Sequence, residues 1–120
     1  MKTWRSNMNL VCVVENEPSE ISDILSEYFS RRFLPYEIKK YADVNTFKDD
    51  YIDGYINPTI LLIEFLTKCN NELTVCKEIR NKGYIGNIII SSYSYECPLE
   101  AFKIDARGYV IRPYNYCDVF

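Results

Sequence analysis

The segment from Asn57 to Arg80 limits the fold of this chain more than any other stretch. The run from Thr59 to Ile63 is apolar and β-favouring, follows the turn signal Asn57-Pro58, and ends in a carboxylate, Glu64. Short apolar runs with such boundaries are typical of strands buried on both faces of a parallel sheet. We therefore expect Glu64 at the carboxyl end of a strand, where open α/β sheets collect ligands. The alternative is a solvated loop carboxylate.

Strand and helix patterns alternate along the rest of the chain. Strand patterns lie at Leu10–Val14, Tyr36–Tyr41, Asn87–Ser92 and Gly108–Ile111. Helical patterns begin near Ile21, near Asn45, near Glu72 (ending at Gly83 as C-cap) and near Tyr95 (with Leu99, Phe102 and Ala106 facing inward). This alternation predicts right-handed crossovers and a doubly wound five-stranded parallel sheet. The two lysines of Tyr36–Tyr41 favour an edge position for that strand.

Length and charge limit the organisation and the partners of the chain. With 120 residues and 48% hydrophobic content, we expect one domain over residues 9–120, preceded by an N-terminal extension, residues 1–8. The net charge of −3 offers no basic field for nucleic acid, so the eleven tyrosines suit a core and interfaces better than base stacking. No apolar run approaches the roughly 20 residues that span a membrane.

Several chemistries lack the residues that they need. The five cysteines include no CxxC pair and the chain has no histidine, so we expect reduced thiols in a cytoplasmic protein and no zinc site. The four glycines form no GxGxxG or GxxxxGK loop, which disfavours a small flavodoxin-like enzyme or nucleotide binder. We expect no enzymatic activity.

The end of the chain leaves little room for a last helix. Seven residues follow Arg112-Pro113, fewer than the roughly 12 that an isolated helix needs, so a fifth helix is expected to be short or missing. Either the protein continues past Phe120, or a partner covers this side. The apolar residues Tyr114, Tyr116, Val119 and Phe120, together with the helix before Gly108 and the strand at Gly108–Ile111, then predict self-association or binding to a protein partner.

Polar residues lie at the carboxyl ends of four of the five expected strands. They are Glu15, Asn16, Glu17, Glu64, Ser92 and Arg112, all expected on one rim. This pattern resembles the receiver domain of two-component response regulators, particularly those that precede LytTR-class DNA-binding domains. The segments VVENEP, LLIEF, EIR, IIISS and AFKIDARGYVIRP carry the resemblance in order over residues 8–114. It implies the flavodoxin-like receiver fold with strand order 2-1-3-4-5.

The resemblance also implies roles for individual residues. It places the phosphorylated aspartate at Glu64, the two magnesium-binding acids at Glu15 and Asn16, and a further acid at Glu17. It places the switch hydroxyl at Ser92, the switch aromatic at Tyr109, and a lysine before a proline at Arg112 and Pro113. Four positions depart from the family: Glu64 and Glu15 are each a methylene longer than aspartate, Asn16 lacks a charge, and Arg112 replaces lysine.

These departures weaken the expected phosphorylation chemistry. Phosphoryl transfer depends on position and charge, and a misplacement of about 1 Å can cost about 100-fold in rate. Glu15 and Glu64 are expected to hold Mg²⁺ weakly if at all. Arginine suits a carboxylate, so we expect Glu64 and Arg112 to form a permanent ion pair that holds the switch in one state.

The sequence therefore favours an atypical receiver domain that signals by protein contact without normal aspartyl phosphorylation. The resemblance implies membership of a transcriptional regulator and a sensor kinase as upstream partner, without direct binding of this segment to nucleic acid. One alternative is a conventional phosphorelay receiver with residual metal binding. Another is a diverged domain in which the charges only form a structural ion cluster.

Overall fold

The computed structural model describes residues 9–15, 21–65, 70–92 and 103–111. These residues form one parallel sheet of five strands in the order β2-β1-β3-β4-β5, as predicted. The strands are β1 (Asn9–Val14), β2 (Tyr36–Tyr41), β3 (Ile60–Glu64), β4 (Asn87–Ser92) and β5 (Gly108–Ile111). The edge position predicted for Tyr36–Tyr41 is confirmed.

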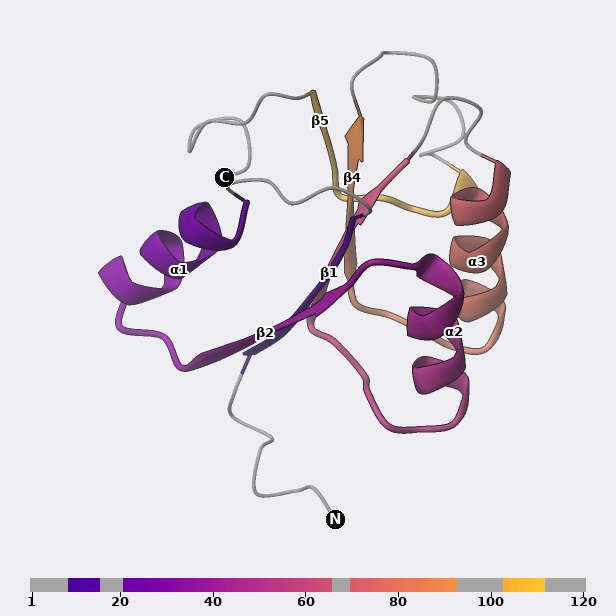
Figure 1. Ribbon diagram of the computed structural model, residues 1–120, viewed down its shortest axis with the longest axis horizontal. Coiled ribbons are helices and arrows are strands. Elements are labelled where there is room, and N and C mark those ends of the chain that lie inside the picture. Colours follow the sequence, from indigo (N-terminus) through magenta and orange to yellow (C-terminus); the bar gives the residue numbers. More distant parts are fainter. Residues whose placement is uncertain (1–8, 16–20, 66–69, 93–102, 112–120) are drawn as a thin grey trace.

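The three described helices lie on both faces of the sheet. Figure 1 shows α1 (Ile21–Arg31) on one face and α2 (Val44–Ile52) and α3 (Asn70–Asn81) on the other. This arrangement confirms the doubly wound architecture. The segments expected to hold the N-terminal extension, most of the helix before β5 and a fifth helix lie outside the described residues.

The central strands bury both of their faces, which explains their continuous apolar sequences. In β1, Val11 and Val13 pack in a core with Leu25 of α1, whereas Cys12 and Val14 pack in the core on the side of α2 and α3. The side chains of these four residues are at most 3% exposed. Alternating side chains therefore supply two cores, one for each face.

The end of α3 confirms the C-cap that the sequence predicts at Gly83. This glycine has φ +98°, a left-handed conformation that costs glycine little. Its N–H donates to the Arg80 carbonyl at 3.0 Å, and the Tyr84 N–H donates to the Ile79 carbonyl at 3.0 Å. These two bonds satisfy carbonyl groups that the helix end would otherwise leave unpaired.

The start of α2 lies one residue before the predicted start. The helix begins at Val44 because Asp43 caps it: the Asp43 carboxylate accepts from the Thr46 backbone N–H at 3.3 Å and from its hydroxyl at 3.2 Å. Phe47 is fully buried as expected, whereas Ile52, one of the apolar residues in the predicted pattern, is 42% exposed.

The helix predicted up to Ala106 ends earlier. Residues 104 and 105 form a turn, and Asp105 has φ 55°. Ala106 still packs against the core, but from the segment that leads into β5. The inward residue of this region that the sequence analysis missed is Ile104, which is 1% exposed.

Among the residues that the structure describes, no helix combines the length and the apolar character that crossing a membrane requires.

Candidate functional site

The register of the sheet brings the predicted strand ends to one rim. Val14 of β1 pairs with Ile63 of β3, and Glu64 pairs with Ser91 of β4. Glu15 and Glu64 therefore follow paired residues on neighbouring strands. Two backbone hydrogen bonds connect the strands at this level. The Glu15 N–H donates to the Tyr41 carbonyl at 3.0 Å, and the Phe65 N–H donates to the Ser91 carbonyl at 2.8 Å. The predicted rim thus exists for the residues described.

Glu64 is a buried carboxylate at the centre of this rim. It is the last residue of β3 and is 5% exposed, so the alternative of a solvated loop carboxylate is wrong. Strand alternation places Glu64 on the same face as Leu62, which belongs to the core beside α1. A charge this deep is costly unless neighbouring groups compensate it, and Glu64 does interact with another group.

The sequence analysis missed one hydroxyl at this level. It selected Ser92, which is the last residue of β4 and is 4% exposed. Ser91, however, is fully buried and is the register partner of Glu64. Partners in parallel register project to the same face of a sheet, so Ser91 shares the face of Glu64 and Ser92 starts on the opposite one. The sequence shows Ser91 as the first of two hydroxyl residues after the apolar run Ile88–Ile90, and the register between β3 and β4 decides that Ser91 is the one on the face of Glu64.

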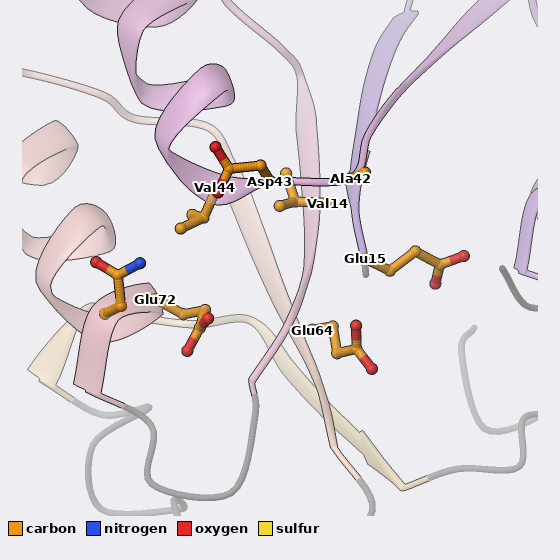
Figure 2. Close-up of a pocket in the computed structure, with 8 residues that line it drawn as sticks. Val14, Glu15, Ala42, Asp43, Val44, Glu64 and Glu72 are labelled. Atoms are coloured by element: carbon orange, nitrogen blue, oxygen red, sulfur yellow. The ribbon is translucent and has the colours of Figure 1, made fainter. Parts of the chain in front are cut away.

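A cleft of about 240 Å³ opens at the rim, between the strand ends and the first turns of α2 and α3. Its lining includes four acidic residues, Glu15, Asp43, Glu64 and Glu72. Figure 2 shows that the carboxylates of Glu15 and Glu64 point to the same side of the sheet. Asp43 and Glu72 were not predicted as site residues. In the sequence, Asp43 is recognisable as an N-cap residue before α2, and Glu72 as an acidic residue in the first turn of α3.

The donor set gives only partial support for a metal ion. Within residues 9–15, 21–65, 70–92 and 103–111, no three His, Cys, Asp or Glu side chains are grouped so that they could hold one. The pair predicted as weak magnesium ligands, Glu15 and Glu64, supplies two carboxylates, and Mg²⁺ often uses one or two with water and phosphate completing its shell.

Thiolate chemistry finds no support in the described residues. Burial raises the pKa of the Cys12 and Cys76 thiols to about 12, so neither thiol ionises near neutral pH.

Of the predicted residues on β5 or after it, the structure describes Tyr109. Tyr109 of β5 is half-buried, pairs with Ile90 and packs against the core on the side of α3. Asn16, Glu17, Arg112 and Pro113 lie outside the described residues. The ion pair of Glu64 with Arg112 therefore stays a prediction.

Solved structures with the same arrangement of strands and helices are receiver domains. The activated receiver domain of DrrB with BeF3 is 17% identical to this chain, with 93% of this chain and 91% of that one covered and a TM-score of 0.67. The response regulator TrrA from Thermotoga maritima, solved in complex with Mg(2+)-BeF, is 24% identical over 93% of each chain, with a TM-score of 0.67. The signal receiver domain of a LuxO-like repressor from Vibrio parahaemolyticus is 15% identical over 93% of this chain and 84% of that one, with a TM-score of 0.71.

The chain has the receiver fold. No protein-family model matches its sequence, and no curated protein matches it either. The likeness of 15 to 24% identity concerns the fold of the receiver domains, while the residues at the rim bear on what this chain does.

Proposed function

We propose that this chain is an atypical receiver domain of a two-component response regulator, which signals by protein contact without normal aspartyl phosphorylation. The observation that carries the proposal is the position of Glu64: a glutamate, 5% exposed, ends the central strand β3 of a receiver fold. Receiver domains carry their phosphorylated aspartate at this position.

The extra methylene of Glu64 opposes phosphorylation. An in-line transfer needs the attacking oxygen, the phosphorus and the leaving group in one geometry, and the family sets that geometry for the shorter aspartate. Glu15, also a methylene longer than aspartate, moves the neighbouring carboxylate as well. When bound, Mg²⁺ would supply charge neutralisation for the transferring group; Glu15 and Glu64 are the described residues that would hold it.

The proposed output is contact with proteins. The helix predicted before Gly108, β5 and the segment after β5 form the proposed surface for self-association or for a protein partner. Tyr109 of β5 is the residue to which this proposal gives the switch role. In this proposal the chain belongs to a cytoplasmic transcriptional regulator, has no enzymatic activity and does not itself bind nucleic acid. A sensor kinase remains a proposed upstream partner.

Incubation with acetyl phosphate and Mg²⁺, followed by intact-mass measurement, tests the proposal. The parent chain is expected to keep its mass, and so is the Glu64→Asp variant, because the metal-binding positions remain altered. The triple variant Glu15→Asp, Asn16→Asp, Glu64→Asp is the smallest set expected to accept a phosphoryl group.

A matched control is the double variant Glu15→Asp, Asn16→Asp, which restores the metal-binding acids but keeps Glu64 and should stay unmodified. A stoichiometric phosphate adduct on the parent chain would establish a conventional phosphorelay receiver instead. An adduct on Glu64→Asp alone would show that the pocket has changed less than we propose.

A further inference from the structure

A second cleft lies at the opposite end of the sheet, where β4 and β5 begin. It has a volume of about 190 Å³ and is lined by Arg80, Ile85, Gly86, Asn87, Asp105 and Arg107. The register explains its position: Ile89 pairs with Gly108, and the Arg107 N–H donates to the Ile88 carbonyl at 2.8 Å. The segments that enter β4 and β5 therefore lie side by side. The cleft is separate from the acidic rim, so its role goes beyond the proposed function.

Arg80 gives this cleft a rigid wall. Its Nε donates to the Ile104 carbonyl at 2.8 Å, and its Nη1 donates to the Tyr84 and Gly86 carbonyls at 3.0 and 2.9 Å. Its Nη2 donates to the Asp105 carbonyl at 3.1 Å. One guanidinium thus joins the segment before β4 to the segment before β5. A surface held in this way loses little conformational entropy when a partner binds.

Arg107 has the opposite character, because its side chain is available. It is exposed, and among the described residues its guanidinium makes no hydrogen bond or ion pair. Ile85, which lines the same cleft, is 94% exposed. An arginine with unused donors beside an exposed apolar side chain is the combination that protein interfaces favour.

We propose that this cleft docks an acidic segment of a partner protein. A partner carboxylate pairs with the Arg107 guanidinium through two parallel hydrogen bonds, and an adjacent apolar side chain of the partner covers Ile85. Charge complementarity selects this partner over a nucleic acid. The cleft offers a single available guanidinium, which matches one carboxylate, whereas a nucleic acid is bound by several cations placed along its phosphates.

The test uses amide and arginine Nε signals of the ¹⁵N-labelled chain. The probe is the acetylated, amidated tetrapeptide Leu-Glu-Leu-Glu, and its control is Leu-Gln-Leu-Gln, which has the same shape without charge. The acidic peptide is expected to shift the signals of Ile85, Gly86 and Arg107 in a saturable way, whereas the control peptide leaves them in place.

Variants assign the binding to the two side chains. Arg107→Gln is expected to weaken binding by about tenfold, the effect of losing a charge-assisted hydrogen-bonded pair, and Ile85→Ser is expected to weaken it as well. Lys40→Gln removes the same charge from an exposed position on the edge strand β2 and should bind as the parent does. Because the Arg107 side chain makes no described contact, signals distant from the cleft should stay unchanged in Arg107→Gln.

Three results would overturn the proposal. They are the absence of shifts at the cleft at millimolar acidic peptide, equal affinity of the parent and Arg107→Gln, and equal displacement of the same signals by inorganic phosphate. Shifts of these signals on simple dilution of the chain would also overturn it, because a second copy would then be the occupant.

Discussion

At the scale of single residues, Gly86 has the least room for a side chain among the four glycines. The Tyr84 hydroxyl donates a buried hydrogen bond of 2.9 Å to the Pro58 carbonyl. A Cβ atom on Gly86 would overlap the Tyr84 hydroxyl and would lie 2.7 Å from the Pro58 carbonyl oxygen. Either the tyrosine or the backbone of Pro58 would have to move to admit a methyl group.

We therefore expect Gly86→Ala to lower the free energy of unfolding by about 2 kcal/mol, the usual effect of overpacking. Urea denaturation followed by circular dichroism would measure the change. Gly108→Ala is the control, because its added Cβ meets Ile89 at an ordinary 3.5 Å. Its stability should change by less than about 1 kcal/mol. A Gly86→Ala variant as stable as the parent would contradict the close approach.

The residues of the rim show what the sequence could and could not predict. Glu15 and Glu64 were predictable, because each directly follows an apolar strand whose carboxyl end has a known place in a parallel sheet. Asp43 and Glu72 were not selected, because they come from helix starts that reach the rim only through the packing of α2 and α3. Ser91 required the register between β3 and β4, which the sequence does not state.

At the scale of elements, one side chain holds three segments together. Arg80, in the last turn of α3, donates to carbonyl groups before β4 and before β5. Arg80→Lys keeps the charge but replaces the planar fork by a single ammonium, which cannot reach four carbonyls at once.

We expect Arg80→Lys to lower the free energy of unfolding by about 2 to 3 kcal/mol, because part-buried carbonyl groups lose their donors. Hydrogen exchange should also accelerate at the amides of residues 104–109. The matched control is Arg31→Lys, in which an exposed pair with Glu27 on α1 changes and stability should stay within about 0.5 kcal/mol. Equal effects of the two substitutions would contradict the role assigned to Arg80.

The same contacts explain where the prediction of elements succeeded and failed. The strands were predictable to within about one residue, because apolar runs between turn residues indicate strands whatever the tertiary contacts around them. The end of the helix before β5 was not, because Asp105 adopts a left-handed conformation that an isolated sequence disfavours. The Arg80 bond to the Asp105 carbonyl and the burial of Ile104 stabilise that turn, and both depend on the tertiary fold.

At the scale of the whole molecule, the two ends of the sheet differ in charge. The cleft at the carboxyl ends of the strands is lined by four acidic residues, whereas the cleft at the amino-terminal ends of β4 and β5 is lined by two arginines and one aspartate. The altered acidic rim of the proposed function and the proposed docking cleft thereby lie at opposite ends of the described sheet. Variants at one end can be tested without altering the other.

Among the described residues, the buried thiols of Cys12 and Cys76 make the stability of the fold depend on pH in the alkaline range. Burial raises the pKa of Cys12 and Cys76 from 9.0 to about 12. Below pH 9.0 both states keep these protons, so the contribution of the thiols to stability is fully present. Above that pH the unfolded chain releases protons that the folded chain retains, and stability falls until the folded thiols also ionise. Burial raises the pKa of Tyr84 in the same direction.

We expect the free energy of unfolding to fall between about pH 9 and about pH 10.5, with each thiol contributing on the order of 1 kcal/mol per pH unit. Urea denaturation at a series of pH values would measure the slope. Cys76→Ala should lower the baseline stability, because it leaves a small cavity, but should also reduce the slope by the share of one thiol. Stability that stays constant across this range would mean that the thiols ionise as readily in the folded chain as in the unfolded one, and that the core around Cys12 and Cys76 admits water.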